Sequence, residues 1–207
     1  MHATNIIAVG NQSKQAKKAV ILLHGRGGTA KDILTLSDHL HISDYALFAP
    51  EATNNSWYPQ SFLAVQQQNE PWLSSALAII KNLVATINKN GIATEQIYLV
   101  GFSQGACLTL EFVARNAARY GGVVAFTGGL IGDTITEMNY HGDFLHTPIF
   151  IGSSDPDPHV PVARVNASTQ ILQHMGALVT KKIYTNMGHT INADEIEQAN
   201  KLIFSTS

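Results

Sequence analysis

The sequence has little cysteine, little charge and no long hydrophobic run. Cys107 is the single cysteine among 207 residues, so no intramolecular disulfide can form, as is usual in a reducing cytoplasm. Every apolar run falls short of the roughly 20 residues that cross a membrane, and no basic segment followed by an apolar stretch opens the chain. We therefore expect a cytoplasmic protein without a membrane span or a signal peptide.

Charge of either sign is sparse and scattered. Charged residues make up 14% of the chain, the formal net charge is -2, and the longest basic runs are the pairs at 17–18 and 181–182. Nucleic acids and anionic membranes attract clustered Lys and Arg, so neither is expected as a partner. His39-x-His41 has no third ligand nearby, and no H-E-x-x-H, G-x-G-x-x-G or P-loop occurs, so neither a metal nor a cofactor is expected. Nothing indicates an oligomeric state.

Short β-rich runs alternate with longer segments of helical period along the whole chain. This alternation predicts an α/β fold, with a mostly parallel central sheet, helices on both faces and a single domain over residues 1–207. The strands are expected at 4–9 (an edge strand), 19–24, 45–49, 96–100, 123–126, 148–151 and 178–184, with Pro50 ending the third. The helices are expected at 30–40, 71–90, 104–119 and 162–175, and from Asn192, where Asn192-x-x-Glu195 resembles a capping box.

The pentapeptide Gly101-Phe-Ser-Gln-Gly105 carries the strongest chemical signal. It matches G-x-S-x-G, follows a predicted strand and precedes a predicted helix, which is the context that the motif requires. A sharp strand-to-helix turn exposes the serine hydroxyl, and the helix N-terminus favours the negative charge of an oxyanion. Ser103 is therefore the predicted nucleophile. Cys107 is a chemical rival, but it falls inside the predicted helix, where a small core residue is expected.

A serine nucleophile needs a histidine base and a carboxylate that orients the base, in the chain order Ser, Asp or Glu, His. Five of the nine histidines follow Ser103. His189 is the predicted base, because it follows the last predicted strand at the edge where open α/β sheets bind ligands. Asp155 and Asp157 lie on one loop after the penultimate strand, and spacing alone does not separate them.

Together these motifs resemble the phospholipase/carboxylesterase family, which includes the acyl-protein thioesterases. Four segments carry the resemblance in family order: Leu22-Leu-His-Gly-Arg-Gly-Gly28, the run from Gly91 to Ala106, Asp157-Pro-His-Val-Pro161 and Met187-Gly-His-Thr190. The resemblance implies an α/β-hydrolase fold. It also implies a serine hydrolase that cleaves a small-molecule carboxylic ester or thioester through an acyl-enzyme intermediate.

The resemblance assigns further roles to single residues. The acid of the family lies in Asp-Pro-x-Val-Pro, which matches Asp157 rather than Asp155. The oxyanion hole would take one backbone N–H from Gln104 and the other from Arg26. Arginine at this position departs from the leucine of the eukaryotic thioesterases, which weakens the case for a long apolar acyl group. His24 is expected to be a buried hydrogen-bonding residue that holds this loop.

Residues 51–70 form a long predicted loop, and long loops in compact domains are often functional. Trp57 and Phe62 in the loop and Trp72 beside it are predicted to line the substrate pocket, since ligand sites are apolar clefts; ordinary packing is the alternative. Two other functions stay open. One is a dienelactone-hydrolase-like enzyme for cyclic esters, although that family normally carries Cys where Ser103 stands. The other is a non-catalytic binding module on a hydrolase scaffold.

Overall fold

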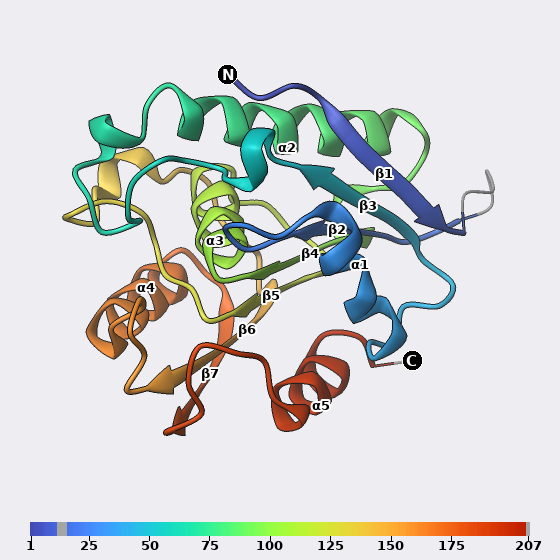
Figure 1. Cartoon of the computed structure of the whole chain (residues 1–207). Helices are drawn as coiled ribbons and strands as arrows, with labels where there is room; N and C mark the ends of the chain where they lie inside the picture. The colour runs from blue at the N-terminus through green and yellow to red at the C-terminus, as the bar shows by residue number, and fades with distance from the viewer. Residues whose placement is uncertain (12–15, 206–207) are drawn as a thin grey trace.

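A mostly parallel sheet forms the centre of the computed structural model, which describes residues 1–11 and 16–205. Within these residues the sheet has seven strands in the order β1-β3-β2-β4-β5-β6-β7 (Figure 1). The strands are β1 (Asn5–Gly10), β2 (Ala19–Leu23), β3 (Ala46–Glu51), β4 (Ile97–Phe102), β5 (Gly122–Phe126), β6 (Pro148–Asp155) and β7 (Leu178–Thr185). β1 runs antiparallel to β3, and the other neighbours pair in parallel.

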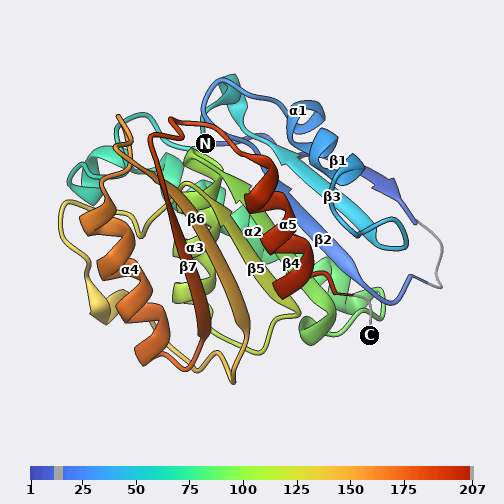
Figure 2. The same cartoon turned by 90° about the horizontal axis from the view of Figure 1, so that it is seen from below.

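Helices cover both faces of the sheet. They are α1 (Ala30–Leu34), α2 (Trp72–Lys89), α3 (Gln104–Arg115), α4 (Val162–His174) and α5 (Ala193–Leu202), with 3₁₀ turns at Thr35–Asp38, Thr53–Asn55, Gln66–Asn69, Thr94–Gln96 and Glu137–Asn139. Figure 2 shows α5 in front of the sheet and α2 and α3 behind it. The α/β fold predicted from the sequence, with a mostly parallel sheet between helices, is confirmed. No helix of the described chain is long and apolar enough to cross a membrane.

The continuous hydrophobic runs follow from burial on both faces. Side chains alternate across a strand, so Leu99 packs into the core beneath α2, α3 and α4, whereas Val100 packs into the core beneath α1 and α5. All residues of β2 and β5 are buried. A strand of this kind needs apolar residues at every position, which is why these runs do not alternate with polar residues.

The parallel order brings distant loops to one edge of the sheet. β2, β4, β6 and β7 all end at this edge, and the loops that follow them carry Arg26, Ser103, Asp157 and His189. Ligands bind at this edge in open α/β sheets. The topology therefore places the predicted site residues in one region of the molecule.

Some predicted boundaries were wrong. Pro50 does not end β3, which continues to Glu51. The pairing of β3 with β2 stops at Phe48, so no hydrogen bond to β2 is needed from the proline, which has no N–H. The helix predicted over 104–119 ends at Arg115, since the next residues turn away and Ala117 N–H donates to His141 O. The segment 30–40 holds the short α1 followed by a 3₁₀ turn. The edge strand β1 and the capping box of Asn192 are confirmed.

Candidate active site

Ser103 lies in a strained turn between β4 and α3. Its φ of 54° and ψ of -117° are unusual for an L-residue and cost on the order of 1–3 kcal/mol. The glycines on both sides are required by close packing. A Cβ on Gly105 would lie 2.1 Å from the Leu23 carbonyl oxygen, and a Cβ on Gly101 would lie 2.4 Å from the Gly105 carbonyl oxygen. The spacing of G-x-S-x-G thus follows from the sharpness of the turn.

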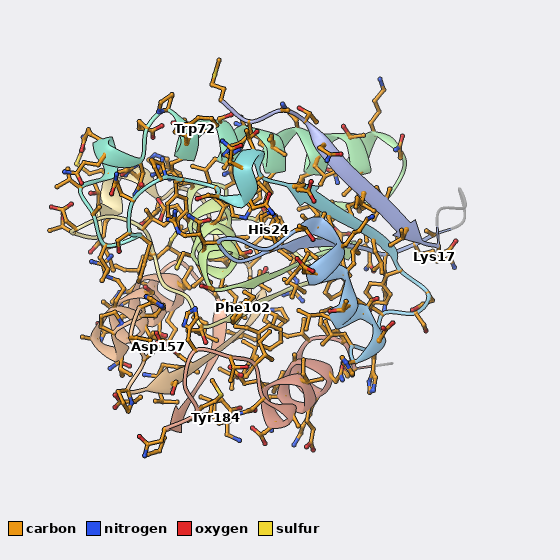
Figure 3. The ribbon with its side chains drawn as sticks, viewed as in Figure 1. Lys17, His24, Trp72, Phe102, Asp157 and Tyr184 are labelled. Carbon is orange, nitrogen blue, oxygen red and sulfur yellow. The ribbon has the colours of Figure 1, made fainter. Side chains whose placement is uncertain are left out.

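The structure brings Ser103, His189 and Asp157 into one hydrogen-bonded chain. His189 Nε2 lies 2.7 Å from Ser103 Oγ, and His189 Nδ1 lies 2.9 Å from Asp157 Oδ2. The side chain of Asp157 is fully buried, whereas that of His189 is 20% exposed, so only the imidazole can be approached from solvent. Figure 3 labels Phe102, the residue before Ser103, and Asp157, which lie at and just beyond the ends of β4 and β6.

The environment of Asp157 favours its ionised form. Burial raises the pKa of this carboxyl, but hydrogen bonds from the His159 N–H, from His189 and from the Val160 N–H outweigh burial and leave the pKa below its ordinary value. An ionised carboxylate only accepts hydrogen bonds, so Nδ1 of His189 must carry the proton that it donates. In neutral imidazole the other nitrogen, Nε2, is then a free acceptor for the Ser103 hydroxyl.

Asp155 lies elsewhere in the same region. It is the last residue of β6, pairs with Thr185 of β7 and exposes its side chain to solvent. The preceding residue, Ser154, ties the two loops together, since its Oγ accepts the Gly188 N–H at 3.0 Å and donates to the Pro156 carbonyl. The longer β6 thus separates two aspartates that spacing alone left as alternatives.

Arg26 and Gln104 both carry a backbone N–H beside the nucleophile that is available to a ligand. Both residues line the same cleft as Ser103, and no acceptor among the described residues bonds either N–H. Gln104 is also the first residue of α3, whose N-terminus carries partial positive charge. Two donors of this kind beside a nucleophile can hold an oxyanion.

The side chains of Arg26 and Gln104 grip one short loop, residues 56–60. Arg26 donates to Ser56 Oγ at 2.9 Å, to the Pro59 carbonyl at 3.0 Å and to the Gln60 carbonyl at 2.7 Å. The carboxamide of Gln104 accepts the Trp57 N–H at 2.9 Å and donates to the Tyr58 carbonyl at 2.8 Å. From the sequence, the arginine side chain at position 26 is only a departure from the leucine of the eukaryotic thioesterases. The structure shows that its guanidinium clamps this loop, with partners about 30 residues away that no local pattern reveals.

The cleft beside Ser103 has a volume of about 760 Å³. Its apolar wall includes Tyr58, Phe62, Leu63 and Val160, and neither Asp nor Glu is among its lining residues. Such a surface suits an apolar ligand that carries no positive charge. Phe62 thus lies where the sequence predicted it.

Trp57 and Trp72 do not line this cleft, contrary to the sequence-based expectation. Trp57 is fully buried, and its Nε1 donates to the His24 carbonyl at 2.9 Å because a buried indole N–H needs an acceptor. Trp72 packs at the start of α2, with its ring centroid 5.1 Å from that of His2. Both indoles serve packing, which was the alternative.

His24 and Cys107 are buried, as expected. His24 Nδ1 lies 2.8 Å from the Gly25 carbonyl, and its Nε2 accepts the Ala52 N–H, so the ring holds the loop after β2. Burial raises the pKa of the Cys107 thiol to about 12, which leaves it protonated and unreactive at neutral pH. No group of three or more His, Cys, Asp or Glu residues in the described structure could hold a metal ion.

Comparison with known proteins gives consistent matches over nearly the full chain. The profile of a family described as Phospholipase/Carboxylesterase matches residues 4–207. Acyl-protein thioesterase 1 of Saccharomyces cerevisiae is 30% identical, with 93% of this chain and 94% of the yeast protein aligned. The crystal structure of a phospholipase/carboxylesterase from Dyadobacter fermentans superposes with a TM-score of 0.98 at 54% identity, covering 99% of this chain and 98% of that one.

Proposed function

The chain belongs to the phospholipase/carboxylesterase family, and we propose that it hydrolyses carboxylic esters with Ser103, His189 and Asp157 as its catalytic triad. The family and the relatives make it a hydrolase enzyme; the triad and its steps are our proposal. The observation that carries the proposal is the continuous chain of hydrogen bonds from Asp157 through His189 to the Ser103 hydroxyl.

In the first half of the reaction Ser103 Oγ attacks the ester carbonyl carbon. His189 Nε2 takes the hydroxyl proton as the new C–O bond forms, and the ionised Asp157 stabilises the resulting imidazolium. The carbonyl oxygen becomes an oxyanion, which the backbone N–H groups of Arg26 and Gln104 stabilise. The tetrahedral intermediate then expels the alcohol, which receives the proton from His189, and an acyl-serine ester remains.

In the second half water replaces the alcohol. His189 takes a proton from water while the water oxygen attacks the acyl carbon. The oxyanion forms again between the same two N–H groups. Collapse of this intermediate breaks the bond to Ser103 Oγ, which regains its proton from His189. The carboxylic acid leaves and the free enzyme is restored.

Thioesters remain a second candidate class of substrate, since the yeast relative is named an acyl-protein thioesterase. The same steps apply, with a thiol as the leaving group. A dienelactone-hydrolase-like activity is less well supported, because the nucleophile position carries Ser103 rather than Cys. The cytoplasmic location stays a prediction.

Replacement of the nucleophile tests the proposal. The variant Ser103→Ala should lose hydrolysis of p-nitrophenyl acetate by about 10³-fold or more and keep its circular dichroism spectrum and melting temperature. A thioester assayed in parallel distinguishes the two substrate classes in the native enzyme. Wild-type turnover by the folded variant would reject Ser103 as the nucleophile. It would then also reject catalysis by this triad on esters and on thioesters.

A further inference from the structure

A second hollow, here named the α1 groove, adjoins the cleft. Its apolar walls come from Ile33 of α1, Leu36 of the turn after α1, Phe102 of β4 and Ile191 of the loop before α5, and its volume is about 350 Å³. This volume is at the lower end of the range of small-molecule sites. Neither the family assignment nor the triad gives the groove a role.

The α1 groove and the cleft meet beside the nucleophile. Gly25, Arg26 and Phe102 line both hollows, and Phe102 directly precedes Ser103. The remaining walls belong to opposite faces of the sheet, because Cys107 of the cleft packs with the α2–α4 core and Ile33 of the groove packs with the α1–α5 core. Ser103 lines the cleft and directly follows Phe102, one of the residues at which the two hollows meet.

An ester also has two parts, which extend from the carbonyl carbon in different directions. His189 gives its proton to the leaving alcohol, so the alcohol must lie against the imidazole. The Phe102 ring lies 5.5 Å from the His189 ring, centroid to centroid, and Ile191 follows His189 by two residues. His189 itself lines the cleft, and the Phe102 ring beside it is a wall of both hollows, so the groove can be reached from the imidazole past Phe102; the apolar wall formed by Tyr58 and Phe62 belongs to the cleft alone.

We propose that the α1 groove binds the leaving group of the substrate, and that this leaving group is an uncharged alcohol with a short alkyl or aromatic chain. The assignment rests on the proposed function, since it requires catalysis at Ser103. Burying an alkyl chain against Leu36, Phe102 and Ile191, which are only half-buried, stabilises the complex through the hydrophobic effect.

Charges around the groove restrict the class of alcohol further. Asp32 lines the groove, and hydrogen bonds from the Thr29 hydroxyl and N–H lower the pKa of this carboxyl, which keeps it ionised. The Arg26 guanidinium is directed toward Pro59 and Gln60, which line the cleft and not the groove. Asp32 therefore disfavours a phosphorylated alcohol, and a neutral alcohol is favoured over an anionic one.

Two isomeric esters test the proposal directly. Hexyl acetate and ethyl hexanoate have the same composition, but the long chain is on the alcohol side in the first and on the acyl side in the second. Thr35 is exposed at the rim of the groove, so Thr35→Trp should fill the groove without disturbing the core. Asp38→Trp is the matched control, because Asp38 is exposed in the same 3₁₀ turn but does not line the groove.

We expect Thr35→Trp to lower kcat/KM for hexyl acetate at least about tenfold relative to the wild type, the scale on which a filled apolar pocket discriminates. Its kcat/KM for ethyl hexanoate should change less than about twofold, and Asp38→Trp should affect neither ester. A second variant, Leu36→Ala, enlarges the groove. It should raise kcat/KM for an ester of a bulkier alcohol, such as cyclohexyl acetate, relative to kcat/KM for ethyl hexanoate.

Two outcomes would overturn the proposal. A loss of kcat/KM in Thr35→Trp that is selective for ethyl hexanoate would place the acyl chain in the groove. If kcat/KM for both esters changes by the same factor from the wild type in the folded variants Thr35→Trp and Leu36→Ala, the groove binds neither part. Failure of the proposed function looks different, because Ser103→Ala would then hydrolyse both esters at the wild-type rate.

Discussion

The imidazole of His189 lies within 2.7 Å of the Ser103 hydroxyl, although 86 residues separate the two in the chain. This contact exists because β4 and β7 are both parallel strands whose carboxyl ends reach the same edge of the sheet. The loop after β7 is held in place by the hydrogen bond from Gly188 N–H to Ser154 Oγ. The geometry of the pair thus follows from the fold, from this bond to β6 and from the bond between His189 and Asp157.

Replacing the two neighbouring aspartates separates their roles. Asp157→Asn removes the charge that stabilises the imidazolium of His189, and it should lower kcat for p-nitrophenyl acetate by on the order of 10³–10⁴-fold. Asp155→Asn is the matched control and should keep kcat within about twofold, because its exposed side chain ends β6 away from His189. Steady-state kinetics of both variants check this. A greater loss with Asp155→Asn would transfer the role of the acid to that residue.

Arg26 should influence turnover through the 56–60 loop. In Arg26→Lys the charge remains, but the planar fork that reaches the Pro59 and Gln60 carbonyls is lost, so the loop and the Arg26 N–H should shift. Misplacing a donor by a fraction of an ångström costs about tenfold or more in kcat. Steady-state kinetics with p-nitrophenyl acetate measure kcat of the variant. Lys31→Ala is the control, because Lys31 is an exposed cation on α1. Wild-type kcat in Arg26→Lys would show that the clamp does not support catalysis.

Glu195 should make stability depend on pH. Burial raises the pKa of its carboxyl from 4.5 to about 7, and its Oε1 has no partner among the described residues. The folded state therefore holds its proton more tightly than the unfolded state does. The contribution of Glu195 to the free energy of unfolding should fall as pH rises from 4.5 to 7, by up to about 3 kcal/mol, and stay constant outside this window.

Glu195→Gln should remove this dependence, since the amide does not titrate and its oxygen can still accept the Asn192 N–H. Urea denaturation at several pH values gives the difference between the wild type and the variant. Glu197→Gln, exposed on the same helix, is the control. A difference that stays constant from pH 4.5 to 7 would contradict the raised pKa of Glu195.

Cys107 should resist alkylation in the folded protein. Cys107 is 1% exposed and the pKa of its thiol is about 12. At pH 8 iodoacetamide therefore cannot reach the sulfur, and almost none of the thiol is ionised. We expect unchanged mass and unchanged esterase activity after treatment, and full modification once guanidinium chloride unfolds the chain. Rapid alkylation of the native enzyme with parallel loss of activity would point to a reactive thiol in the cleft.

Local patterns predict the parts of this structure that depend on local physics. The run at β2 and the helical period of α2 follow from burial, and the turn at Ser103 follows from glycines at fixed positions. The order of parallel strands then predicts that His189 and an aspartate approach Ser103. These expectations required no knowledge of side-chain contacts.

The packing partners of single side chains were beyond the reach of the sequence. The hydrophobicity of Trp57 predicts burial but not the choice between core and cleft. The partners of the Arg26 guanidinium lie in a loop with no periodicity, so nothing in the residues around it indicates a clamp. The two aspartates differ only because β6 continues to Asp155, which spacing does not reveal.

Covalent labelling tests the role of Ser103 most directly. The native enzyme is treated with a fluorophosphonate, digested and mapped by tandem mass spectrometry. We expect one adduct per chain, on the hydroxyl of Ser103, formed in step with loss of esterase activity and strongly slowed in His189→Ala. An adduct on another residue, or an enzyme that keeps its activity with Ser103 fully modified, would contradict the assignment of the nucleophile.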